Sequence, residues 1–275
     1  MCEFLAVSRS GYYAWKKRGQ SKRAQADTAL VSQIRYIYTE SRKVYGYPRI
    51  HVALRIQGVR VARKRVARLM RVNGIVAAPH RRMRWKSAFK TATAADNLVQ
   101  RQFNVPQPNQ VWAADMTAFW TSSGWVHLAI VMDLFSRRIV GWSMHGQMTE
   151  RLVLDALEMA ILSRQPADSL IHHSDQGSQY RSHLFQTKLR EYNIQISMSR
   201  RGNCWDNAVV ESFFKTLKTE LQNDARFGSR EEARSQLFEY IEVFYNRRRM
   251  HSTLGYLSPA QYELNCPSLV SVKAG

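Results

Sequence analysis

The sequence predicts an α/β protein in which a mixed-sheet domain is preceded by a small all-helical domain. From about Thr28 to Gly74, apolar residues recur at helical spacing. After Pro108, three strand-like runs follow in series, and strand then alternates with helix, which requires crossovers and a mixed sheet. Charge divides in the same way. Residues 1–100 include 22 basic and 4 acidic residues, whereas the remaining 175 residues include 19 basic and 17 acidic residues.

Helical periodicity defines the first domain, residues 1–78. Pro48 opens a short helix that ends near Gly58, and a further helix follows from about Val61 to Asn73. Two short helices joined through a glycine, the second of them basic, are typical of a helix-turn-helix. We interpret three cations on one face of the second helix as DNA contacts, with a merely solvated charged face as the alternative. These cations are Lys64, Arg68 and Arg71.

Residues 79–108 are expected to form a basic linker. Periodicity disappears there, and the stretch from His80 to Lys90 is basic, with Trp85 and Phe89 interleaved. Such a segment suits contact along a nucleic acid. The excess positive charge of residues 1–100 calls for a polyanion, for which DNA, RNA and an anionic membrane are alternatives.

The expected core spans residues 109–225 and starts with an antiparallel meander. Its strands run over about Val111–Phe119, Trp125–Asp133 and Arg137–Met144. The later elements are a helix at Thr149–Ser163, a strand at Leu170–His172, a helix at Ser182–Tyr192, a strand at Ile194–Met198 and a helix at Asn207–Leu221. Residues 226–275 are expected to form a C-terminal helix, over Ser229–Tyr245, and a basic tail.

Two aspartates stand where a lone charge is costly. Asp115 lies within the apolar run VWAADMTAF, and Asp175 follows an apolar strand in the tight loop SDQGSQY. Burying an unpaired carboxylate is unfavourable, so each predicts a charged partner. A turn or capping role is the alternative, which suits Asp175 beside Gly177 better than Asp115 in mid-strand.

A third candidate acid, Glu211, borders the apolar stripe of the last core helix and can point along the sheet surface. Alone it would be an ordinary helix glutamate. Lys215 and Lys218 follow on the same face, where surface pairing is the alternative to holding a phosphate backbone. Three carboxylates at one edge would repel each other without a cation, which favours Mg²⁺ or Mn²⁺. Two such ions can serve phosphoryl transfer.

Other ionisable residues are left out of this site. His172 and His173 are neighbours in a strand and point to opposite faces, so they cannot easily bind one metal ion together. Asp133 at a strand end and Asp206 before the Glu211 helix are interpreted as capping residues.

Six segments carry a resemblance to a known family. They are ADMT, SDQGSQY, RRGNCWDNAVVESFFKTLKTE, YNRRRMHSTLGYLSP and, near the N-terminus, VSRSGYYAW and YGYPRI. Through them nearly the whole chain resembles the B-frame transposase of the insertion sequence three family, which is related to retroviral integrases. The family's spacing of 35 residues between the second and third acids is also present, between Asp175 and Glu211.

The resemblance implies a ribonuclease H-like core in which Asp115, Asp175 and Glu211 bind two Mg²⁺ or Mn²⁺ ions for DNA strand cleavage and strand transfer. It also implies that Lys215 and Lys218 contact DNA ends, and that double-stranded DNA supplies both the element ends and the target. The family's full transposase is usually a frameshift fusion with an upstream helix-turn-helix and leucine zipper. We therefore expect a homo-oligomer on DNA and the upstream A-frame product as partners.

Three other functions stay open. One is a nuclease of the same fold that does not join strands, and another is a DNA-binding regulator with a vestigial metal site, against which the intact triad argues. The third is a basic RNA-binding scaffold, against which the lack of an aromatic sheet motif or GXXG loop argues. Three scattered cysteines and the lack of a membrane-length apolar run predict a DNA-associated protein of the bacterial cytoplasm, with no membrane partner.

Overall fold

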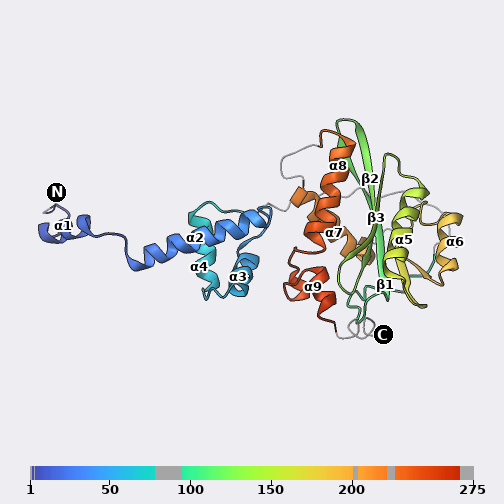
Figure 1. The fold of residues 1–275 in the computed structure, drawn as a ribbon, viewed down its shortest axis with the longest axis horizontal. Helices are drawn as coiled ribbons and strands as arrows, with labels where there is room; N and C mark the ends of the chain where they lie inside the picture. Colours follow the sequence, from blue (N-terminus) through green and yellow to red (C-terminus); the bar gives the residue numbers. More distant parts are fainter. Residues whose placement is uncertain (1, 3, 78–94, 201–203, 222–226, 267–275) are drawn as a thin grey trace. The chain divides into compact units, whose positions relative to one another are not determined.

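The computed structural model describes residues 2, 4–77, 95–200, 204–221 and 227–266 of the chain (Figure 1). The chain consists of two compact units, Met1–Ala78 and Pro79–Gly275. The basic stretch from His80 to Lys90, expected to lie along DNA, is outside the described residues. No helix in the described ranges is long and apolar enough to cross a membrane.

The first unit is all-helical, as expected. Its helices are α1 (Arg9–Lys17), α2 (Lys22–Glu40), α3 (Tyr47–Ile56) and α4 (Arg63–Val72). The last three pack together around Ile34, Ile50, Leu54 and Val66, none of which is exposed. By contrast, α1 buries no residue. The helix α2 begins before the expected Thr28 because the Ser21 hydroxyl caps it, accepting a hydrogen bond from the Ala24 N–H.

The α3–α4 connection forms a helix-turn-helix-like pair. Pro48 lies in the first turn of α3, where its missing N–H is harmless. At the other end the Val59 N–H donates to the Leu54 carbonyl, and Gly58 adopts a φ of +81°, which a residue with a side chain rarely adopts. This hydrogen bond and the left-handed conformation of Gly58 end α3 and lead the chain directly into α4.

The second unit contains a five-stranded mixed sheet in the order β3-β2-β1-β4-β5. The strands β1 (Val111–Thr121), β2 (Gly124–Asp133) and β3 (Ile139–His145) form the expected antiparallel meander. The strands β4 (Ile171–Ser174) and β5 (Gln195–Met198) extend the sheet in parallel. The predicted α/β fold class, with a mixed-sheet core after a small helical domain, is therefore confirmed.

Helices cover both faces of this sheet (Figure 1). On one face, α5 (Glu150–Arg164) and α6 (His183–Glu191) bury the main apolar cluster, to which Trp112 and Ala114 of β1 contribute. The opposite face receives α7 (Ala208–Leu221) and α8 (Arg230–Phe238), which contact β1. Because side chains alternate along a strand, Asp115 lies on the α7 side.

The C-terminal segment, expected to be a helix and a basic tail, packs against the core. After α8 the chain continues as a π-helical segment, Glu239–Tyr245, and ends its described part near α9 (Pro259–Leu264). Arg249 is 5% exposed, and its guanidinium binds the Glu220 carboxylate of α7 at 2.7 Å. On α9, the Glu263 carboxylate binds Arg138 at 2.7 Å. Buried ion pairs thus make the described part of this segment integral to the core.

Candidate active site

The parallel pairing of β1 with β4 positions the two aspartates. The register ends with Ala113 opposite His173. Asp115 and Asp175 each follow two residues later, so the chain delivers both to the same level of the sheet. Asp115 remains inside β1, opposite Ile130 of β2, while Asp175 begins the loop after β4.

Glu211 reaches this level because α7 runs alongside β1. The Asn207 side-chain N–H donates to the Ala114 carbonyl at 3.1 Å, and the Lys218 Nζ lies 5.6 Å from the ring centre of Phe119. Eleven helical residues at about 1.5 Å each and five strand residues at about 3.3 Å each both span roughly 16 Å. One helical turn after Asn207, Glu211 therefore lies beside the strand near Asp115.

Asp115 is influenced electrostatically by the other two acids. Burial raises the pKa of Asp115 to about 8, and the charges of Asp175 and Glu211 add to that effect, against the Met116 N–H and the Lys218 ammonium. Burial also raises the pKa of Asp175, opposed by the Gly177 N–H, and burial raises the pKa of Glu211. The site therefore disfavours three negative charges unless a cation joins them.

The free oxygen atoms suit a hard cation. Asp115 Oδ1 accepts a hydrogen bond from the Met116 N–H at 2.7 Å, and Asp175 Oδ1 accepts one from the Gly177 N–H at 2.9 Å. The second carboxylate oxygen of each aspartate has no hydrogen bond to a described residue. Oxygen ligands of this kind are those that Mg²⁺ and Mn²⁺ prefer. Within the described ranges, however, no three His, Cys, Asp or Glu side chains converge enough to hold a metal ion as they stand.

Sequence reasoning did not assign two buried polar groups near these acids. The side-chain oxygen of Asn207 and the hydroxyl of Tyr180 are both buried without a hydrogen-bond partner among the described residues. Burial raises the pKa of Tyr180 well above its usual value, and the charges of Asp115 and Asp175 contribute. The position of Asn207, one helical turn before Glu211, was a signal in the sequence that could have identified it.

Asp206 does not cap α7 as predicted. Its fully buried carboxylate accepts hydrogen bonds from the backbone and side chain of Arg200 at 2.9 Å, from Arg101 at 3.0 Å and from Asn97 at 2.9 Å. The Arg200 guanidinium holds the pKa of Asp206 far below its ordinary value. Asp206 thus ties the chain before the core to the segment that leads into α7.

The two lysines of α7 occupy different environments. Lys215 is exposed. Lys218 is half-buried, and burial lowers the pKa of its ammonium group while the charge of Asp115 raises it. Lys218 is therefore close enough to Asp115 to sense its charge, whereas Lys215 faces solvent.

The predicted DNA-contacting cations of the first unit lie on α4. Lys64 and Arg71 are exposed. Arg68 is also exposed, but its guanidinium binds the Asp27 carboxylate of α2 at 2.5 Å, next to Arg65 at 2.6 Å. Arg68 would have to leave Asp27 to contact a phosphate.

The residues left out of the metal site occupy structural positions. His172 packs against the rings of Tyr180 and Phe185, while His173 hydrogen-bonds Ser197 and the Asp206 carbonyl, so the two histidines do point to opposite faces. The Asp133 carboxylate accepts hydrogen bonds from the N–H groups of Asn109 and Phe135, as expected for a strand-end cap.

Family models match both units. An HTH-like domain model matches residues 25–83, and two integrase core domain models match residues 105–204 and 192–259. Both integrase matches fall in the sheet-containing unit, and together they include all three candidate acids.

Curated relatives extend this similarity over almost the whole chain. The insertion element IS600 uncharacterized 31 kDa protein of Shigella sonnei is 41% identical over 95% of this chain and 97% of its own length. Transposase InsF for insertion sequence IS3A of Escherichia coli is 42% identical over 96% of this chain and 92% of its own length.

A solved structure supports the fold. A chain of the simian T-cell lymphotropic virus intasome, determined by cryo-electron microscopy, superposes with a TM-score of 0.50 and 17% sequence identity. The superposition covers 79% of this chain and 71% of that chain.

Proposed function

The chain belongs to the IS3 family of transposases, and on that premise we propose that Asp115, Asp175 and Glu211 are the metal-binding carboxylates of its catalytic site. It is a polynucleotidyl transferase of the integrase and transposase superfamily, which cleaves DNA strands and transfers them during transposition. The observation that carries the site assignment is the register of β1 with β4, which places Asp115 and Asp175 at the same level of the sheet.

The three carboxylates would act as ligands rather than as proton carriers. Asp115 and Asp175 each have one oxygen without a hydrogen bond to a described residue, and backbone N–H groups fix the orientation of the other oxygen. Glu211 approaches on α7, held beside β1 by Asn207. Mutual repulsion keeps the acids from closing on one another alone, so we expect their side chains to converge only around cations.

The integrase core family is metal-dependent, and two Mg²⁺ or Mn²⁺ ions are proposed for this site. When bound, such ions activate an attacking oxygen and neutralise the leaving oxygen of a phosphodiester. The protein's part is to fix the ligands on rigid elements and to position the phosphodiester between them. Water would first hydrolyse the phosphodiester at the element end and leave a free 3′-hydroxyl. This hydroxyl would then attack a target phosphodiester in line, forming a new phosphodiester bond and displacing the 3′-oxygen of the target strand, with no covalent protein intermediate.

DNA contacts are proposed for both units. Lys215 and Lys218 follow Glu211 on the same face of α7 and can hold the phosphate backbone beside the scissile bond. Lys64, Arg68 and Arg71 on α4 can bind the duplex at a second place, with Arg68 exchanging Asp27 for a phosphate. A homo-oligomer on paired ends, the upstream A-frame product and a location in the bacterial cytoplasm remain part of this proposal.

A cleavage and joining assay tests the site. Labelled duplex DNA carrying the parent element's end, with a target plasmid and Mg²⁺ or Mn²⁺, is incubated with the wild type, Glu211→Gln and the control Glu150→Gln. Glu150 is exposed in the first turn of α5. We expect metal-dependent cleavage and joined products from the wild type and the control, and a loss of at least 10²-fold in Glu211→Gln.

The products separate the alternatives. Equal activity in Glu211→Gln and the wild type would refute the assigned triad. Cleavage without joined products would show that the protein acts as a nuclease and does not transfer strands. If wild-type protein were inactive on every substrate but gained activity when the upstream A-frame product was added, that partner would be required for the reaction.

A further inference from the structure

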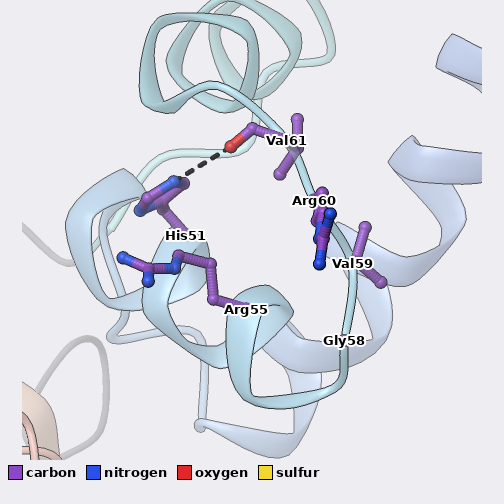
Figure 2. A pocket seen from close by; sticks show the side chains of 6 residues that line it. All are labelled: His51, Arg55, Gly58, Val59, Arg60 and Val61. Carbon is purple, nitrogen blue, oxygen red and sulfur yellow. Dashed lines mark hydrogen bonds between the residues drawn. The ribbon is translucent and has the colours of Figure 1, made fainter.

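The helical unit contains a basic pocket that neither the fold nor the catalytic site explains (Figure 2). It has a volume of about 670 Å³ and lies between the C-terminal half of α3 and the turn that leads to α4. Every titratable residue in its lining is basic. The lining consists of His51, Arg55, Gly58, Val59, Arg60 and Val61.

The walls of this basic pocket are braced. The His51 Nε2 donates a hydrogen bond to the Val61 carbonyl at 3.1 Å, which joins α3 to the turn across the pocket (Figure 2). At the C-terminal end of α3, the Gly58 N–H donates to the Arg55 carbonyl at 3.0 Å. Two cations, one on each wall, are therefore attached to a backbone whose geometry is already fixed. They are Arg55 and Arg60.

The charge of the pocket is not neutralised within the described part of the unit. Arg55 and Arg60 are exposed and form no ion pair with a described residue. Of the two acids on α2, Asp27 and Glu40, Asp27 is already occupied by Arg65 and Arg68 of α4. Two unpaired guanidinium groups at a braced concavity attract an anion, and their planar forks suit the paired oxygens of a phosphate.

The position of the pocket favours a phosphate of a polymer. The adjoining helix α4 begins at Arg63 directly after the turn and carries Lys64 and Arg71 on exposed positions. A backbone phosphate held at the turn would orient α4 on a duplex without reading any base, which is the role that phosphate contacts have in DNA recognition. This step rests on the proposed function, in which the chain binds DNA.

We propose that the basic pocket seats one phosphate of the DNA backbone between Arg55 and Arg60, and that His51 acts as a positioning residue that keeps the two walls together. The seated phosphate fixes the register of α4 along the duplex. Loss of the two arginines then removes one particular phosphate contact, and not merely two units of charge.

Equilibrium binding of the full chain to labelled element-end duplex tests the proposal. Duplexes carrying one neutral methylphosphonate linkage at each backbone position in turn are compared between the wild type and the Arg55→Gln/Arg60→Gln variant. The charge-matched control is Arg18→Gln/Arg23→Gln, since both residues are exposed at the start of the unit. Far-ultraviolet circular dichroism checks that each variant keeps its helices.

At one linkage we expect the neutral substitution to weaken wild-type binding about tenfold and to leave the pocket variant's affinity unchanged. The pocket variant should also lower the slope of log K against log salt by about one. The control variant should lose as much affinity as the wild type when that linkage is neutral. Additive effects at every linkage, or an equal loss of sensitivity in the control, would overturn the pocket as a phosphate site.

The pocket and the proposed function can fail separately. If the Arg55→Gln/Arg60→Gln variant binds DNA like the wild type while wild-type protein cleaves and joins strands, only the pocket proposal is wrong. If wild-type protein binds no duplex at any salt concentration, either alone or with the upstream A-frame product, both proposals are wrong. The variant Arg55→Lys/Arg60→Lys keeps both charges but not the guanidinium groups. If it still loses affinity when that one linkage is neutralised, but binds more weakly than the wild type, positive charge makes the contact and the guanidinium forks give it its full strength.

Discussion

The Asn207 side-chain amide donates its hydrogen bond to the carbonyl of Ala114, the residue that precedes Asp115. This contact is formed where β4 stops pairing with β1. It sets the height of α7 along the strand, and with it the position of Glu211 relative to Asp115.

Asn207→Ala should therefore reduce the rate of strand transfer more than it reduces the fraction of folded protein. Removing the donor leaves the Ala114 carbonyl without this hydrogen bond, at a cost of about 1–3 kcal/mol of unfolding free energy. A small shift of α7 would lower strand transfer roughly 10²-fold. Single-turnover joining and urea unfolding measure the two effects, with Asn104→Ala, an exposed asparagine, as the control. Activity that falls only as far as the folded fraction falls would argue against a positioning role.

The two lysines of α7 should differ in what they control. Lys218 senses the charge of Asp115, so Lys218→Gln makes the acidic site more negative and should lower the half-saturating Mg²⁺ concentration for cleavage. Lys215 is exposed, so Lys215→Gln should leave the Mg²⁺ requirement unchanged and reduce the salt slope of DNA binding by about one. Metal titrations and binding across salt concentrations separate these effects. An identical Mg²⁺ dependence in all three proteins would contradict the position given to Lys218.

Local patterns in the sequence were sufficient for most of the core. The meander and the crossover helices follow from the alternation of apolar and polar residues. The places of Asp115 within a strand and of Asp175 after one follow from charges in apolar runs. The helix α1 was not predicted, although the Ser8 hydroxyl caps it, because its nine residues are too few to show a repeated helical period. Both outcomes have one cause, because a periodic apolar pattern identifies an element only where that element is long enough to repeat the pattern.

Long-range contacts between charged residues were beyond such reasoning. Nothing in the local pattern shows that Arg249 of a basic run is buried against Glu220, or that Asp206 binds Arg101 more than 100 residues earlier in the chain. The same holds for Asn207, whose partner on β1 is distant in sequence. Periodicity identifies which face of an element is buried, but pairing of buried polar groups depends on the tertiary fold.

The buried pair between Glu220 and Arg249 should be important for stability. Arg249→Gln leaves a carboxylate that is 5% exposed without its cation, which should lower the unfolding free energy by roughly 3–5 kcal/mol. The double variant Glu220→Leu/Arg249→Met should recover part of this loss, because it removes both charges. Urea unfolding measures each variant, with the exposed Arg247→Gln as control. Equal losses in the Arg249 and Arg247 variants would show that the buried pair contributes nothing particular.

The Asp206 network should make the core sensitive to acid. The Arg200 guanidinium lowers the folded-state pKa of Asp206 below the ordinary value of 3.8. A lowered pKa contributes stability that is present above the unfolded pKa and is lost as the pH falls toward the folded pKa. Asp206→Asn keeps the shape of the side chain but removes the charge, so it should lower the unfolding free energy at pH 7 by roughly 2 kcal/mol.

This difference between the wild type and Asp206→Asn should stay constant from pH 7 to pH 5 and narrow by roughly half a kcal/mol at pH 3.5, because the wild type then protonates on unfolding. Urea unfolding followed by tryptophan fluorescence at each pH measures it, and Asp168→Asn, an exposed aspartate, should show neither the loss nor the narrowing. A difference that does not change with pH would mean that the carboxylate acts through its shape alone. Because the network also holds the segment that leads into α7, strand transfer should fall in Asp206→Asn and not in Asp168→Asn.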